Sequence, residues 1–245
     1  MPSKAKASRE ADEKWFGSRG EIASLVVAVL SLAVASWAAY TSLTTANRQT
    51  DIAHNQTDIA QEGNALKKLL SSFGRDIIQS QNVVQRDVMK TIGQRVQNWQ
   101  GHATIVSGLF RSGKSVAIAE VLRGVRGVVQ MSVRNDKWED ELYSKLGVSS
   151  AGMLEDVLKE AREELRADGD NLSKAPIIIL DVPRKSKADI DTISTFAKEY
   201  ASDGGPAHIV VVASSATTAL GFDAGGPDRR FDIWVGDTGQ QIALA

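Results

Sequence analysis

The stretch of sequence that decides the fold is Ala103-Thr-Ile-Val-Ser-Gly-Leu-Phe-Arg-Ser-Gly-Lys-Ser115. Its first five residues are rich in β-branched side chains and predict a buried strand over 103–107. The next eight, Gly108 to Ser115, fit the pattern G-x-x-x-x-G-K-[S/T] at every fixed position, and a helical run from Lys114 to Arg123 follows. A glycine-rich loop between a strand and a helix predicts a phosphate-binding loop.

The chemistry of such a loop comes from its backbone. Glycines at both ends permit a turn in which successive N–H groups point inward, and the following helix presents the positive end of its dipole. We expect Lys114 to contact the β and γ phosphates and the Ser115 hydroxyl to ligate Mg²⁺. The predicted nucleotide-binding residues of the loop are Gly108, Leu109, Phe110, Arg111, Ser112, Gly113, Lys114 and Ser115. The alternative is a glycine-rich loop that binds nothing.

Apolar runs alternate with helical stretches through the rest of the region 100–245, as in α/β domains with a buried parallel sheet. Four more strands are predicted, at Gly127–Val133, Pro176–Asp181, His208–Ala213 and Phe231–Val235. Helical periodicity covers Lys137–Lys145, Met153–Arg166 and Lys187–Tyr200, with Asp136 and Ser150 as candidate helix caps.

The strand Ile177-Ile-Ile-Leu-Asp181 ends in a carboxylate two strands after the loop. This arrangement is typical of a Walker B element, whose Asp holds the Mg²⁺ shell. We therefore predict Ser115 and Asp181 as metal ligands, and Lys114 and Asp181 as catalytic residues. The alternative for Asp181 is a helix-capping or solvent-facing side chain at a strand end.

With both motifs in place, the region from His102 onward resembles a P-loop NTPase of the additional-strand class, which includes the AAA+ and STAND ATPases and related archaeal-type ATPases. The resemblance implies a five-stranded parallel sheet in the order 5-1-4-3-2 with helices on both faces, and ATP and Mg²⁺ as cofactors. It also implies a polar sensor residue at Ser214 or Ser215, of which we predict Ser214 as a nucleotide contact. Arg229-Arg230 resembles an arginine finger, although a charged turn explains these residues equally well. No N-K-x-D sequence occurs, so the resemblance favours ATP over GTP.

Two departures from that family bear on catalysis. Val182 and Pro183 follow Asp181 where the family places an acidic residue, and no helical lid follows the fifth strand before Ala245. ATP hydrolysis therefore stays open, and the expected function is that of an ATP-binding protein that acts as a slow or switch-like Mg-ATPase. The alternatives are a coiled-coil interaction protein with a vestigial P-loop fold and a small-molecule kinase.

The N-terminal part divides into a polar segment, 1–20, and an apolar segment, 21–43. The run from Ile22 to Tyr40 lacks charge and would measure roughly 28 Å as a helix, close to the thickness of a bilayer core. This predicts a transmembrane helix and a single-pass membrane protein. The basic N-terminus leaves the topology open, and an organellar inner membrane is one compartment that fits. The alternatives are a cleaved signal peptide with Ala33-Val-Ala35 as its cleavage site, a targeting presequence and a buried core helix.

Residues 44–99 contain a repeat of seven residues, Gln49–Ala53 and Gln56–Ala60. Apolar residues keep this spacing in two series, Ile52, Ile59, Leu66 and Phe73, and Leu70, Ile77 and Val84. The pattern predicts a coiled-coil stalk and a homo-oligomer formed through it. The alternative is a helix that folds back on the α/β domain and buries Ile77, Val84, Val88 and Ile92.

Composition adds few constraints. Lys and Arg total 29 against 30 Asp and Glu, so the chain has no excess of basic residues and no nucleic-acid partner is predicted. A protein partner stays unidentified. Cysteine is absent, which excludes disulfides and thiolate chemistry. The histidines, His54, His102 and His208, are too far apart in sequence to predict a metal site.

Overall fold

The computed structural model describes residues 4–71, 87–99, 102–201, 204–222 and 230–236. Its contacts divide the chain into two units, Met1–Asp58 and Ile59–Ala245, and each is considered by itself. The second unit holds the α/β domain that the sequence predicts.

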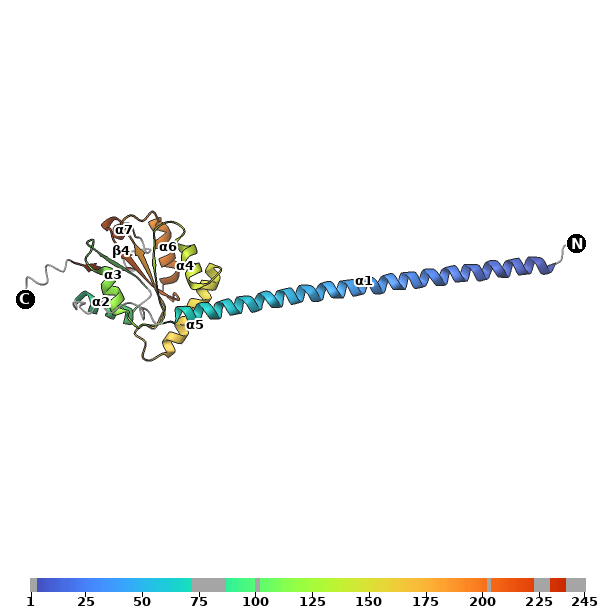
Figure 1. Ribbon diagram of the computed structural model, residues 1–245, viewed down its shortest axis with the longest axis horizontal. Helices are drawn as coiled ribbons and strands as arrows, with labels where there is room; N and C mark the ends of the chain where they lie inside the picture. Colours follow the sequence, from blue (N-terminus) through green and yellow to red (C-terminus); the bar gives the residue numbers. More distant parts are fainter. Residues whose placement is uncertain (1–3, 72–86, 100–101, 202–203, 223–229, 237–245) are drawn as a thin grey trace, which may run out of the picture. The chain divides into compact units, whose positions relative to one another are not determined.

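Five parallel strands form one sheet (Figure 1). They are β1 (Ala103–Gly108), β2 (Val128–Ser132), β3 (Ile177–Val182), β4 (His208–Ala213) and β5 (Arg230–Val235). The order β2-β3-β4-β1-β5 is the predicted 5-1-4-3-2 read from the other edge, so this part of the fold prediction is confirmed. Because all pairs are parallel, the carboxyl ends of the strands meet at one edge of the sheet.

The predicted helices of the domain are present with slightly shifted ends. They are α3 (Lys114–Val121), α4 (Trp138–Leu146), α5 (Ala151–Ala167) and α6 (Ile190–Ala201), and a short α7 (Ala216–Gly221) follows β4. Ser150 is confirmed as a cap, since its Oγ accepts a hydrogen bond from Met153 N at 3.2 Å. The prediction for Asp136 is wrong: its Oδ1 accepts from Asp189 N at 3.0 Å and so ties two loops together.

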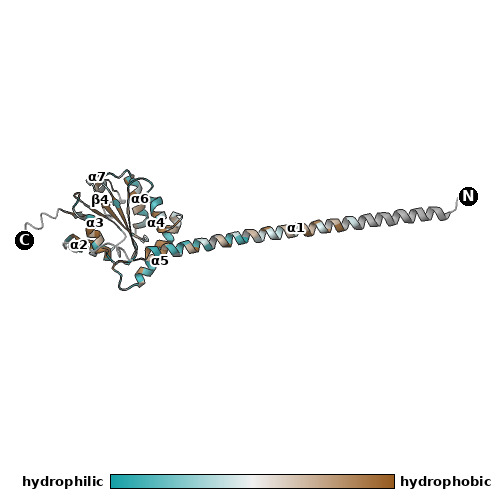
Figure 2. Ribbon diagram, in the orientation of Figure 1, coloured by the Kyte–Doolittle hydropathy of each residue, from teal (hydrophilic) through white to brown (hydrophobic). Residues whose placement is uncertain are grey.

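Helices cover both faces of the sheet because side chains alternate along each strand. On one face, residues such as Ile105 and Ile178 pack against α4, α5 and α6 and against Leu69 at the end of α1. On the other face, residues such as Val106 and Ile179 pack against α3 and α2 (Asp87–Gln97). Figure 2 shows the apolar strands as brown ribbons between helices of mixed colour.

Two parts of the predicted stalk pack on the domain: the end of α1, where Leu66 and Leu70 of the predicted heptad series contact the core, and helix α2. Helix α2 is the second of them. It buries Met89, Ile92 and Val96, as the fold-back alternative expects for Ile92, and Val88 is partly buried there. A polar network ties its end to the sheet: Arg95 Nε donates to Thr104 Oγ1 at 3.1 Å, which lies 2.8 Å from Nε2 of His208. Trp99 stacks on the His208 ring at 5.6 Å. Ile77 and Val84 lie outside the described residues.

Helix α1 runs from Lys4 to Leu69 and so spans both the predicted membrane segment and the first part of the stalk. The heptad residues Ile52 and Ile59 are exposed on it, by 56% and 68%. Phe73, which continues that series, lies outside the described residues. The coiled-coil stalk therefore stays a prediction.

The predicted transmembrane helix over 21–43 is not found. Among the residues that the structure describes, no helix is long and apolar enough to cross a membrane. A span needs about 20 consecutive apolar residues, and the described part of α1 carries hydroxyl side chains at Ser31, Thr41 and Ser42, each bonded to a carbonyl of the preceding turn. The prediction of a single-pass membrane protein in an organellar or other membrane is corrected with it. Val27 and Leu30 are exposed, so the buried core helix is not found either.

Candidate nucleotide-binding site

The loop begins at Gly108, the last residue of β1, which pairs with Val235 at the end of β5. Its φ is +148°, and a Cβ placed on it would lie 2.2 Å from the Val235 carbonyl oxygen. A larger residue cannot occupy this position without moving β5. The first glycine of the motif therefore holds the loop against the edge strand.

The middle of the loop is a tight turn, in which Ser112 N donates to Leu109 O at 3.1 Å. Arg111 has a φ of +64°, and its guanidinium lies 5.3 Å from the centre of the Phe110 ring. Gly113, with a φ of +82°, is the N-cap of α3. The N–H groups in the first turn of a helix have no partner within it, so this end of α3 offers donors and a positive dipole to an anion.

Lys114 lies beneath this turn with only 6% of its surface exposed. Its Nζ donates to the carbonyl oxygens of Gly108 at 3.0 Å and Leu109 at 2.8 Å. Burial lowers its pKa, and the charge of Asp181 partly opposes this shift. The ammonium is therefore inside the loop, where the motif predicts it.

Asp181 comes from β3, which is separated from β1 by β4. Ser115 lies close enough to the Asp181 carboxylate to affect its pKa, so the first turn of α3 and the end of β3 meet. Burial raises the pKa of Asp181, and the charge of Lys114 and the hydroxyl of Ser115 oppose this shift. The structure thus brings together the two predicted metal ligands and the predicted lysine.

These residues fit a magnesium ion bound together with phosphate. Within the described ranges, no group of three or more Asp, Glu or His side chains is arranged so that it could hold a metal ion. Mg²⁺ does not need one, because it is held by one or two protein oxygens together with substrate phosphates and water. The oxygens of Ser115 and Asp181, which are close enough to interact, supply such a pair.

The predicted sensor residues follow β4. Ser214 N donates to Val182 O at 3.1 Å, which places Ser214 beside the end of β3. The Ser215 hydroxyl is the N-cap of α7 and accepts from Thr218 N at 3.1 Å. Of the two serines, Ser214 therefore fits the predicted nucleotide contact better.

The other predicted elements lie elsewhere. Val182, directly after Asp181, has an aliphatic side chain that is buried with 2% of its surface exposed, so this position supplies no acid to the loop. Arg230 pairs with Ala103 at the amino-terminal ends of β5 and β1, whereas the loop follows the carboxyl end of β1. Arg229 lies outside the described residues.

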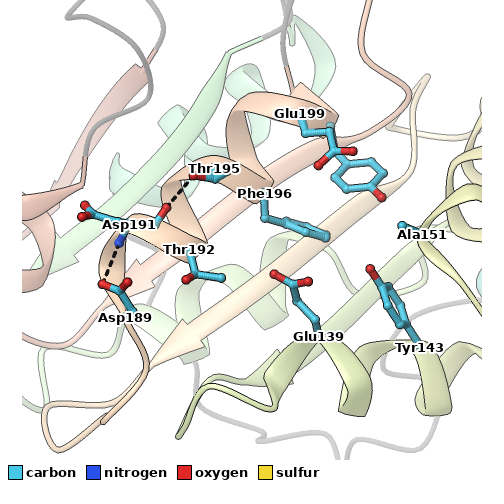
Figure 3. A pocket seen from close by; sticks show the side chains of 10 residues that line it. Glu139, Tyr143, Ala151, Asp189, Asp191, Thr192, Thr195, Phe196 and Glu199 are labelled. Atoms are coloured by element: carbon cyan, nitrogen blue, oxygen red, sulfur yellow. Dashed lines mark hydrogen bonds between the residues drawn. The ribbon is translucent and has the colours of Figure 1, made fainter.

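An acidic pocket of about 380 Å³ lies between α4 and α6, and the loop residues take no part in it. Figure 3 shows Glu139 and Tyr143 of α4 facing Phe196 and Glu199 of α6, with Asp189 and Asp191 at one side. Burial and the neighbouring charges of Glu199 and Asp140 raise the pKa of Glu139. The carboxylates that line the pocket repel phosphate, so this pocket does not fit a nucleotide. No short stretch of sequence reveals this pocket, because its acids are far apart along the chain.

The comparisons with known proteins identify no family. No family model and no curated protein matches the chain. Among solved structures, a chain in the structure of Drosophila ORC bound to GC-rich DNA and Cdc6 is similar, with a TM-score of 0.35 and 14% identity. The match covers 61% of this chain and 56% of the other, little more than half its length. A likeness this weak carries no argument about function.

The class follows instead from the strand order and from the site. A parallel sheet in the order β2-β3-β4-β1-β5, with a G-x-x-x-x-G-K-S loop between β1 and α3, defines a P-loop-like α/β fold. Such folds bind nucleotides through this loop.

Proposed function

We propose that the chain is an ATP-binding protein that acts as a slow or switch-like Mg-ATPase. One observation supports this most: the Lys114 ammonium donates to the loop carbonyls of Gly108 and Leu109, and its charge and the Ser115 hydroxyl both act on Asp181. Bound Mg²⁺ would neutralise charge on the phosphates, and Lys114 would exchange its two carbonyl partners for phosphate oxygens. Burial disfavours the ionised form of Asp181 and so raises its pKa. A bound divalent cation would stabilise the ionised form.

Slow turnover is proposed because of the residue that follows Asp181. A water molecule that attacks a phosphate needs a base or a group that orients it. Buried Val182 stands at the position where the related ATPases carry an acid. Asp189 and Asp191 line the acidic pocket instead.

Binding is tested by calorimetry of Mg-ATP with the full chain. Lys114→Ala removes the buried ammonium and should weaken binding at least tenfold. Lys137→Ala, at an exposed site before α4, should leave binding unchanged. Equal affinity of both variants for Mg-ATP would contradict the proposal. Release of phosphate from ATP by the same preparations then separates a slow enzyme from a binding protein.

The second candidate is an interaction protein in which the P-loop fold is vestigial. Ile52 and Ile59 favour it, because they are exposed on α1 at the heptad spacing of a coiled-coil seam and would be covered in a homo-oligomer. Sedimentation of the full chain with Ile52→Asp and Ile59→Asp tests the association. Dimers that these substitutions dissociate, in a protein that binds no Mg-ATP, would favour this candidate.

A further inference from the structure

Trp234 is an exposed aromatic residue near the carboxyl end of β5, and the phosphate-binding loop starts at the carboxyl end of the neighbouring strand β1. It lies on β5 with 61% of its surface exposed, next to Val235 at the strand end. In the register of the sheet it pairs with Ser107, and Val235 pairs with Gly108, the first residue of the loop. A single exposed tryptophan needs no explanation on a protein surface; this one stands beside an anion site.

The close contact at Gly108 keeps Trp234 in this place. A Cβ on Gly108 would lie 2.2 Å from the Val235 carbonyl oxygen, so the end of β5 is held against the start of the loop. Ile233 and Val235 are buried in the core with α2 and α3. Side chains alternate along a strand, so Trp234 points to the other side of β5, an edge strand.

The polarity of the site tells which end of a nucleotide would come here. Asp181, the acid that would hold the metal ion beside the terminal phosphates, belongs to β3, which lies on one side of β1 beyond β4. β5 borders β1 on the opposite side. A triphosphate held in the loop with its terminal end toward Asp181 extends its nucleoside end toward β5.

We propose that Trp234 is the stacking residue for the base of a nucleoside triphosphate. The assignment rests on the proposed function, since it requires phosphates in the loop. An indole face offers a large apolar surface that stacks on any base. Trp234 therefore adds affinity for nucleosides over inorganic phosphates, and it does not select one base.

The test compares Mg-ATP with magnesium tripolyphosphate, which has the phosphates and no base, by calorimetry on the full chain. Trp234→Ala should weaken ATP binding about 5- to 100-fold and leave tripolyphosphate binding unchanged. Trp234→Phe should keep most of the affinity for ATP. Trp37→Ala is the matched control, because Trp37 is also exposed, by 71%, and lies on α1.

The outcomes separate this inference from the proposed function. If the unaltered chain binds neither ATP nor tripolyphosphate, the proposed function fails and the stacking role with it. If both bind and Trp234→Ala changes neither affinity, or lowers both equally, the stacking role alone is overturned. A loss for ATP without a loss for GTP would also overturn it, because stacking treats both bases alike.

Discussion

Replacement of Gly108 by alanine tests the link between the loop and the edge strand most directly. The new Cβ would lie 2.2 Å from Val235 O, more than 1 Å short of an ordinary contact of 3.4 Å. β5 must move away, or β1 must leave its register with β5. Either change disturbs the pairing that holds both Gly108 and Trp234 in place.

The expected cost has two parts. A Cβ at positive φ costs about 1–2 kcal/mol, and overpacking against a backbone atom costs about 1–3 kcal/mol. Together they reduce the free energy of unfolding by about 2–5 kcal/mol, a large share of the roughly 5–15 kcal/mol of a typical domain. Gly124→Ala is the matched control, since Gly124 has a φ of +75° and open space around its Cβ position. It should show the first cost only.

The assay is equilibrium unfolding in urea of the full chain, followed by near-ultraviolet circular dichroism. Trp138, fully buried and in edge contact with Phe196 at 5.0 Å, supplies the signal of the domain core. The loss in Gly108→Ala should exceed that in Gly124→Ala by about 1–3 kcal/mol. Equal losses in the two variants would refute the reasoning that the contact with Val235 requires glycine.

Three further predictions concern single side chains. Burial raises the pKa of Asp181 above its usual value of 3.8. The contribution of its protonated form to stability is therefore present below that pH and is lost as pH rises through the native pKa. Asp181→Asn should then be more stable than the unaltered chain between about pH 4 and pH 7, as measured by urea midpoints. Burial, with a smaller effect of Arg95, lowers the pKa of His208 from 6.5 to about 3. The contribution of the neutral ring to the free energy of unfolding is therefore present above pH 6.5 and is lost as pH falls toward 3. His208→Gln should reduce the dependence of the free energy of unfolding on pH in this range, and an unchanged slope would contradict the reasoning. Ser150→Ala removes the cap of α5 and should cost about 1 kcal/mol, whereas exposed Ser144→Ala should change stability by less than about 0.5 kcal/mol, and equal effects would show that the cap contributes nothing.

Patterns within a short stretch of sequence predicted their elements well. The strand from His208 to Ala213 has the predicted bounds, and Ser150 caps α5 as predicted. Asp136 misled because an Asp near a helix start can bond to any N–H within reach, and Asp189 N on a distant loop is the one it contacts. Capping requires a particular local geometry, which composition alone does not supply.

The N-terminal segment shows a different limit. Its helix is present as part of α1, but the described residues of that helix lack the apolar length for a membrane crossing. Helix formation depends on local propensity, whereas a membrane crossing depends on an unbroken apolar run over about 20 residues. The first requirement is met by α1, and the second is not.

The amino-acid sequence by itself determined the loop motif from Gly108 to Ser115 and the apolar run that ends in Asp181, because each is written in neighbouring residues, whereas the order of the strands was expected only from a family resemblance. Tertiary structure alone decided the rest. It brought Ser115 and Asp181 together, placed Asp189 and Asp191 in an acidic pocket away from the loop, and placed Trp234 beside the loop. These contacts depend on which strands pair and which helix faces which, and residues distant in sequence meet only when the sheet has formed.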